Sequence, residues 1–398
     1  MSLANGRSHL AIPGPSIMPD RVLQAMHQPA PNIYEGALVE LTAGLVPDLK
    51  WVAGTEHHVA MYICNGHGVW EAALANTVAP GEKVLVPSCG RFGHGWAEFA
   101  TRMGIEVELI DFGKRAPMDL EVVGRALEAD KDHKIKAVLA THVDTSSSVL
   151  NDIPALRKLM DDLGHPAMLW ADCVASMGCD RFEMDAWGVD LAITASQKGL
   201  MTPPGMAFIF FSPKAQAARE GMKMVSPHWD WNARAFPQMF YEFFGGTAPT
   251  HHLFALREAL NMMREEGLEA IWKRHDVLAR ALWAAADVWG QDGPMELNIA
   301  DPACRSRAVT SLRLESPNAT ALRDWVSANA GVTLGIGLGM VEMGDPAWHG
   351  FFRVGHMGHL NAHGMMGVIG VMEAGLQALQ IPHTGGAVAA AAGVIAKG

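Results

Sequence analysis

The sequence predicts an α/β fold in which a large domain with a mostly parallel, doubly wound sheet precedes a smaller C-terminal α+β domain. Two observations support this prediction. From about residue 58 to residue 212, short apolar runs alternate with segments of helical pattern, as in parallel sheets covered on both faces. Several of these runs are almost continuously apolar, which is typical of strands that are buried on both faces.

The elements of the large domain follow in order along the chain. The strand predictions are His58–Cys64, Lys83–Val86, Glu106–Ile110, Ala137–Thr141, Ala167–Asp172, Leu191–Thr194 and Ala207–Phe211. The helix predictions between them are Trp70–Val78, Trp96–Met103, Leu120–Ala129 and Ile153–Leu163. Helical spacing then runs from His251 to about Gly290, and Gly267 divides it into two helices.

Beyond Gly290 the pattern changes to that of a smaller unit. Its predicted strands and helices are Ala308–Leu314, Gly331–Leu334, Phe351–Val354, Ala319–Asn329 and Ala362–Leu379. We therefore expect a large domain over residues 20–265 and a small domain over residues 266–398, joined by the N-terminal segment 1–19.

Composition excludes several classes of protein. The 398 residues contain 31 Lys plus Arg against 42 Asp plus Glu, a net charge of -11 that argues against a nucleic-acid-binding surface. The five cysteines form no Cys-x-x-Cys pair, which fits a reducing compartment and no zinc ribbon. No apolar run approaches the ~18 residues of a membrane span, and the N-terminus lacks a signal-peptide pattern. We expect a soluble cytoplasmic protein without a metal, a nucleic-acid partner or a membrane partner.

Two charged side chains follow apolar strands. Lys198 comes just after the strand that ends at Thr194, and Asp172 ends the strand Ala167–Asp172. Residues at the carboxyl ends of parallel strands can reach one crevice at the edge of the sheet. Each residue also has an ordinary explanation, as a surface lysine at a turn or as an aspartate that caps the next helix. Together they are the pair that pyridoxal phosphate chemistry needs, a lysine for the Schiff base and a carboxylate beside the pyridine nitrogen.

A glycine-rich turn supplies a third component. Asn65-Gly66-His67-Gly68 lies between the first strand of the alternating region and the helix Trp70–Val78. Glycines there let backbone N–H groups point toward an anion at the N-terminus of the helix. A tight turn without any ligand is the alternative. In combination with the lysine and the carboxylate, the turn completes a set suited to a cofactor that carries a phosphate.

On these residues the sequence resembles the class V aminotransferases of pyridoxal phosphate fold type I, and within them the serine/alanine–glyoxylate branch. The resemblance covers nearly the whole chain, through HLAIPGPSIMPDRVLQAM, NGHGVWEAALANTVAPGEKVL, CGRFGHGW, ASQKGLMTPPG and FFRVGHMG. The segments around Lys198 and in FFRVGHMG are the specific ones.

The resemblance implies a role for each matching residue. Those assigned to pyridoxal 5'-phosphate are Lys198 (Schiff base), Asp172 (pyridine nitrogen), Gly66, His67 and Gln197 (phosphate), Phe92 (stacked ring), Thr145 (ring oxygen) and Thr247 (phosphate, across a homodimer). Arg353 matches the arginine that binds the substrate α-carboxylate, and its forked guanidinium suits that task. Tyr34 lies near the expected substrate entrance. Packing roles for Phe92 and Tyr34, and a neighbouring hydroxyl in place of Thr145, stay open.

The implied activity is transfer of an amino group from a small L-amino acid, such as alanine or serine, to glyoxylate, which yields glycine and a 2-oxo acid. Segments Asn32–Glu35 and Val143–Thr145, and an insertion over Met343–Gly350, depart from the family pattern and leave the amino donor undetermined. Two alternatives remain at this point. One is another fold type I enzyme, such as a lyase or a desulfurase using Cys304, and the other is an inactive binding protein with the same fold.

Overall fold

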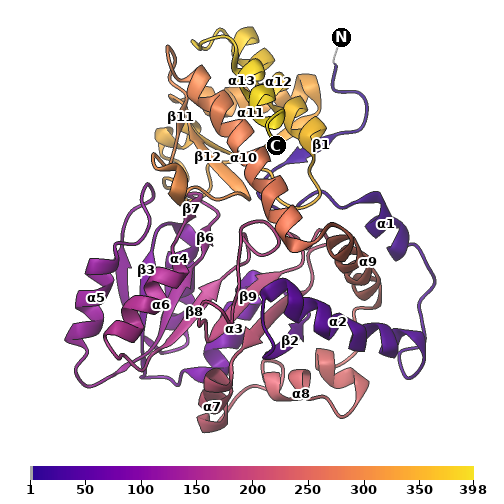
Figure 1. Cartoon of the computed structure of the whole chain (residues 1–398), viewed down its shortest axis with the longest axis vertical. Coiled ribbons are helices and arrows are strands. Elements are labelled where there is room, and N and C mark those ends of the chain that lie inside the picture. Colours follow the sequence, from indigo (N-terminus) through magenta and orange to yellow (C-terminus); the bar gives the residue numbers. More distant parts are fainter. Residues whose placement is uncertain (1–2) are drawn as a thin grey trace.

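A seven-stranded sheet forms the centre of the large domain in the computed structural model, which describes residues 3–398 (Figure 1). In sheet order the strands are β2 (His58–Tyr62), β10 (Ala207–Phe211), β9 (Leu191–Ala195), β8 (Met168–Asp172), β5 (Ile135–Thr141), β3 (Lys83–Ser88) and β4 (Glu106–Asp111). All seven predicted strands are present. The five from β9 to β4 are parallel, whereas β10 is antiparallel to both β9 and β2.

Helices cover both faces of this sheet, as the apolar runs predict. Neighbouring residues of β8 show why, because Leu169 and Trp170 are both fully buried but belong to different hydrophobic cores. The helices of the large domain are α1 (Asp20–Met26), α2 (Ala37–Ala53), α3 (Gly66–Thr77), α4 (Arg91–Arg102), α5 (Leu120–Ala129), α6 (Ile153–Asp162), α7 (Pro213–Gly221), α8 (Trp231–Ala235), α9 (Thr250–Glu266) and the 3-10 helix η1 (Phe240–Phe244). A short hairpin of β6 (Val143–Asp144) and β7 (Val149–Leu150) stands beside the sheet.

A five-stranded sheet forms the small domain, and its edge strand comes from the N-terminus. In sheet order the strands are β1 (His9–Ala11), β13 (Val332–Ile336), β14 (Phe351–Gly355), β12 (Val309–Arg313) and β11 (Glu296–Leu297). Its helices are α10 (Leu268–Trp289), α11 (Asn318–Ala330), α12 (Ala362–Ala378), α13 (Ala387–Ile395) and the 3-10 helices η2 (Pro302–Cys304) and η3 (Pro346–Gly350). In Figure 1 the indigo β1 lies beside the orange and yellow elements of the chain's other end.

The long helical region is divided where the sequence predicts. Gly267, with a φ of 82°, separates α9 from α10. Along α10 the packing changes, because Ile271 belongs to a core of the large domain and Leu278 to the core of the small domain. The domain limits of 20–265 and 266–398 remain a prediction.

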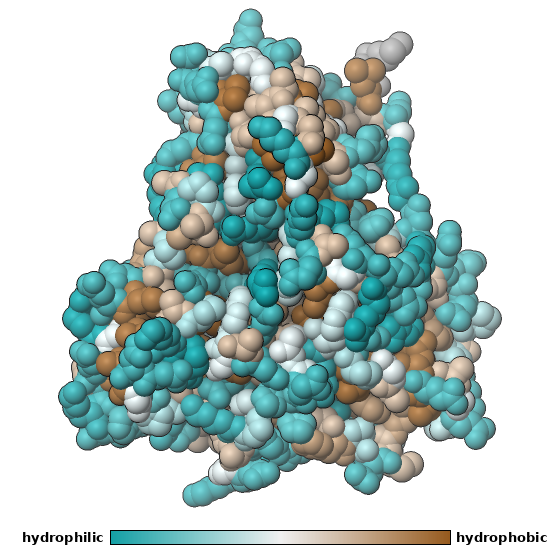
Figure 2. Space-filling model, in the orientation of Figure 1, coloured by the Kyte–Doolittle hydropathy of each residue, from teal (hydrophilic) through white to brown (hydrophobic). Residues whose placement is uncertain are grey.

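The outer surface is mainly hydrophilic on the face shown in Figure 2, with scattered apolar patches. Among residues 3–398, no helix is both long and apolar enough to cross a membrane.

Candidate active site

A cavity of about 200 Å³ lies at the carboxyl ends of β8 and β9, where the N-termini of α3 and α4 meet them. Open α/β sheets bind their ligands at this edge. Seven of the residues singled out in the sequence line the cavity together, namely Gly66, His67, Phe92, Thr145, Asp172, Gln197 and Lys198. Residues from five separate segments of the chain thus converge on one small space.

Lys198 follows β9 and is half-buried in the cavity wall. Its Nζ donates a hydrogen bond to the main-chain carbonyl of Pro13. Burial lowers the pKa of the amine to about 8, and the nearby charge of Arg353 acts in the same direction. A lysine with such a pKa has an appreciable neutral fraction near pH 7 to 8, and the neutral amine is the nucleophile.

Asp172 ends β8 with its side chain buried. Its Oδ1 accepts from the Val174 N–H at 2.8 Å, and its Oδ2 accepts from the Trp70 indole Nε1–H at 2.8 Å. Burial raises the pKa of this carboxyl to about 6, although the two hydrogen bonds oppose the shift. The carboxylate therefore predominates at neutral pH, where it can stabilise a protonated ring nitrogen.

The turn at the N-terminus of α3 has a more specific arrangement than the sequence predicts. The helix begins at Gly66 rather than Trp70, because the Asn65 side chain caps it. Asn65 Oδ1 accepts from the N–H groups of His67 and Gly68, at 3.1 and 3.4 Å. An anion that uses these two N–H groups must therefore displace the Asn65 amide.

The residues present fit pyridoxal phosphate. The Oε1 of Gln197 is buried in the cavity and has no hydrogen-bond partner anywhere in residues 3–398, which leaves a polar group for a ligand to satisfy. A helix N-terminus for a phosphate, a lysine for an aldehyde and a carboxylate for a ring nitrogen line the same cavity.

Asp144 holds the N-terminus of α4 in place, although in the sequence it is marked only by its departure from the family pattern. Its Oδ2 accepts from the N–H groups of Phe92 and Gly93, at 2.8 and 3.2 Å. Its Oδ1 accepts from the N–H of Ser146 at 2.9 Å. The capping group of α4 thus comes from β6, far along the chain, and it fixes the first turn, which carries Phe92.

Arg353 lies on β14 in the small domain, buried beside the cavity but not among its lining residues. Its Nε donates to the Ile336 carbonyl at 2.8 Å and its Nη1 to the Thr145 carbonyl at 2.9 Å. Burial lowers the pKa of the guanidinium to about 10, so it stays charged at neutral pH. Through Thr145 this cation connects the small domain to the cavity.

Two residues from the sequence analysis lie away from the cavity. Thr247 is exposed in the segment after η1, and Tyr34 is 86% exposed between α1 and α2. A single chain therefore does not bring them to the other seven. Three histidines elsewhere in the chain bond to other groups of the protein. His251 and His252 contact the carbonyls of Gln28 and Pro204, and His356 contacts Thr310 and the Arg307 carbonyl.

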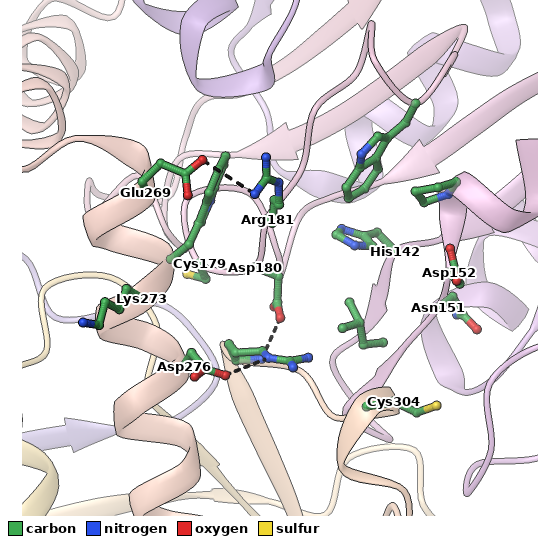
Figure 3. A pocket seen from close by; sticks show the side chains of 16 residues that line it. His142, Asn151, Asp152, Cys179, Asp180, Arg181, Glu269, Lys273, Asp276 and Cys304 are labelled. Carbon is green, nitrogen blue, oxygen red and sulfur yellow. Dashed lines mark hydrogen bonds and ion pairs between the residues drawn. The ribbon is translucent and has the colours of Figure 1, made fainter. Parts of the chain in front are cut away.

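A second, larger pocket of about 660 Å³ lies where the loop after β8 faces α10 (Figure 3). It shares no lining residue with the 200 Å³ cavity. Cys304, the cysteine considered for a desulfurase, lines this larger pocket. Neither Lys198 nor Asp172 lines it, so Cys304 is not placed to act on a substrate bound at Lys198.

The fold and the cavity together define an enzyme of the pyridoxal phosphate fold type I class. A family model described as aminotransferase class-V matches residues 67–357. The serine–glyoxylate aminotransferase of Methylorubrum extorquens is 37% identical over 93% of this chain and 91% of its own. The L-aspartate–glyoxylate aminotransferase of Paracoccus denitrificans is 33% identical over 96% of this chain and 94% of its own.

A solved structure agrees with this assignment. That of the ureidoglycine–glyoxylate aminotransferase from Bacillus subtilis superposes with a TM-score of 0.86 at 25% identity, covering 99% of this chain and all of the other. The chain belongs to the class V aminotransferase family, and it is a pyridoxal-phosphate-dependent aminotransferase.

Proposed function

We propose that this aminotransferase moves an amino group from a small L-amino acid to glyoxylate, which yields glycine and a 2-oxo acid. The observation that carries the proposal is the convergence of Lys198, Asp172 and Gln197 on one cavity of about 200 Å³ in a class V chain. Three relatives named above differ in their donors, serine, L-aspartate and ureidoglycine, but share glyoxylate in their names. The acceptor is therefore better supported than the donor.

Lys198, Asp172 and Arg353 have distinct tasks in this proposal. When bound, pyridoxal phosphate supplies an electrophilic aldehyde carbon and a ring that withdraws electrons from the substrate α-carbon. Lys198 holds the cofactor, and its freed amine removes the proton from the α-carbon and later returns it. Asp172 keeps the ring nitrogen protonated, and Arg353 orients the substrate through its carboxylate.

The remaining side chains hold the cofactor in place. The N-terminus of α3 at Gly66 and His67, together with Gln197, binds the phosphate, while Phe92 packs on the ring and Thr145 lies near its oxygen. We further propose a cytoplasmic homodimer in which Thr247 reaches the phosphate of the second subunit. Tyr34 is proposed to contact the substrate at the entrance of the site.

The test is to follow the visible absorption of the cofactor-loaded protein while L-serine, L-alanine and L-aspartate are added separately, and then to add glyoxylate. We expect one donor to bleach the band and glyoxylate to restore it with the formation of glycine. Bleaching that pyruvate or 2-oxoglutarate reverses but glyoxylate does not would overturn the acceptor. A band that none of the amino acids bleaches would contradict the proposed donor class.

A further inference from the structure

A short N-terminal segment holds Lys198 at two points. This segment, Ile12–Ser16, is called the N-terminal strap below. The Ser16 N–H donates to the Gln197 carbonyl at 2.8 Å, and the Ser16 Oγ–H donates to the Lys198 carbonyl at 2.7 Å. The Lys198 amine in turn donates to the Pro13 carbonyl. The strap therefore contacts both the main chain and the reactive end of the same lysine.

The strap passes so close to the lysine that its sequence is constrained. Gly14 has a φ of 103°, and a Cβ built at this position would overlap the Lys198 amine. Glycine is the residue that adopts this backbone conformation without strain and leaves this space empty. Ser16 is itself almost fully buried, with 6% of its surface exposed.

The other side of the strap lies against β13 and β14, and β14 carries Arg353. A Cβ at Gly335 would lie 2.6 Å from Cδ of Pro13, and one at Gly355 would overlap the Ile12 carbonyl. Gly335 is the register partner of Arg353 between β13 and β14. The strap is thus wedged between Lys198 and the sheet of the small domain.

We propose that Ser16 is a positioning residue for Lys198 and that the Pro13 carbonyl receives the lysine amine whenever the amine is not bonded to the cofactor. Ser16 does not line the cavity, so it acts through the lysine main chain. Pro13 packs against Gly335, the pairing partner of Arg353. The strap therefore also fixes the position of the lysine amine relative to the guanidinium that is proposed to bind the substrate carboxylate. This inference rests on the aminotransferase activity and not on the choice of glyoxylate.

The test compares Ser16→Ala with Ser212→Ala in the full-length protein. Ser212 is a matched control, because it is 7% exposed and its Oγ accepts from Ala215 N–H at the start of α7, outside the cavity. Ser16→Ala loses one buried hydrogen bond, whereas Ser212→Ala loses two, because the Ser212 Oγ also donates to the Asp190 carboxylate at 3.3 Å. The melting temperature of the control should therefore fall at least as far as that of Ser16→Ala. We expect only Ser16→Ala to speed amide hydrogen exchange across residues 196–202 of the apoprotein, by about fivefold or more.

Kinetics provide the second measurement. For Ser16→Ala loaded with cofactor, we expect kcat to fall about tenfold while KM for the amino donor stays within about twofold, since a misplaced lysine slows proton transfer rather than binding. Exchange and kcat indistinguishable from those of Ser212→Ala would overturn the proposal.

Two further points keep the test decisive. If Ser16→Ala does not fold, Ser16→Cys takes its place, because the thiol is similar in size to the hydroxyl but is a weaker hydrogen-bond donor. Faster exchange over residues 196–202 is again expected. Native-like exchange in that variant would count against the strap. The exchange measurement uses no substrate, so it tests the role of Ser16 independently of the proposed reaction. A protein that turns over no amino acid with glyoxylate would disprove the proposed function but would not change the exchange result.

Discussion

Burial lowers the pKa of Lys198 to about 8 and raises the pKa of Asp172 to about 6. Between these two values the lysine is mainly protonated and the aspartate mainly ionised. Raising the pH through 8 produces the neutral amine, whereas lowering it through 6 neutralises the carboxylate. Activity should therefore decrease at low pH as Asp172 becomes protonated, and the neutral amine of Lys198 should become more abundant as the pH rises.

The rate at which the apoprotein captures pyridoxal phosphate should follow the lysine. Only the neutral amine attacks the aldehyde, so the rate constant should rise up to tenfold per pH unit below pH 8 and level off above it. Stopped-flow absorbance between pH 6.5 and about 9.5 measures this rate. A profile that is still rising tenfold per pH unit at about pH 9.5 would show a lysine with an ordinary pKa.

Trp70 donates a hydrogen bond to Asp172, which lowers the pKa of this carboxyl against the effect of burial. Trp70→Phe removes the donor that favours the ionised carboxylate, so the pKa of Asp172 should rise further, by about one unit. The acid limb of kcat/KM should then move to higher pH. Trp96→Phe is the matched control, because Trp96 packs on Trp70 with ring centroids 6.1 Å apart but its Nε1 has no hydrogen-bond partner in residues 3–398. Equal profiles for the two variants would refute this role.

Residues with distinctive chemistry were predictable from the sequence, whereas those that position them were not. Lys198 and Asp172 follow apolar strands, and that pattern indicated their place at the sheet edge. The side chains of Trp70 and Ser16 each act through one hydrogen bond to a residue far away in sequence, and no local pattern predicts such contacts. Asp144 is the positioning residue that the sequence came closest to indicating, because it is a carboxylate next to a run of Ser and Thr residues.

Helix α4 depends on a cap from another element. Its own N-cap, Gly90, has no side chain, and the Asp144 carboxylate from β6 instead accepts from the N–H groups of Phe92 and Gly93 in the first turn. A carboxylate at this end also interacts favourably with the helix dipole. The position of Phe92 above the cavity is therefore a property of the β6–α4 pair rather than of α4 alone.

Asp144→Ala should destabilise the protein by about 2 to 3 kcal/mol, because buried N–H groups lose an ionised acceptor. Asp119→Ala is the control, since Asp119 caps α5 in the same way at an exposed position, and about 1 kcal/mol is expected there. Urea unfolding of both variants measures the difference. A smaller loss for Asp144→Ala than for Asp119→Ala would contradict the cross-element cap.

At the scale of the whole molecule, the exposed residue Thr247 is the one for which a second subunit is proposed. Large exposed side chains lie near Thr247 in sequence, including Met239 at 57% and Tyr241 at 55% exposure. Exposed apolar side chains that gather on one surface are typical of sites covered by another protein. This surface is consistent with the proposed homodimer.

Thr247→Ala should raise the dissociation constant for pyridoxal phosphate about tenfold if the hydroxyl reaches the partner's phosphate. Thr250→Ala is the control, because the Thr250 Oγ1 bonds to the neighbouring His251 ring instead. Equilibrium dialysis gives the dissociation constants, and sedimentation velocity gives the oligomeric state. A monomer at micromolar concentration, or equal affinities for the two variants, would oppose the shared site.

The layered architecture was predictable because buried parallel strands leave a strong apolar signal, as in Met168–Asp172. The direction of β10 was not predictable, because an antiparallel strand buried on both faces has the same apolar pattern as its parallel neighbours. The three-residue β1 was missed for another reason. Its pairing with β13 depends on residues at the far end of the chain.

The origin of β1 has a consequence for synthesis. His9 is made long before its partner Val332. The strap that holds Lys198 therefore cannot be fixed on its small-domain side until β13 and β14 have been made. A large domain that folds during translation should expose an open lysine turn, and these two strands should close it.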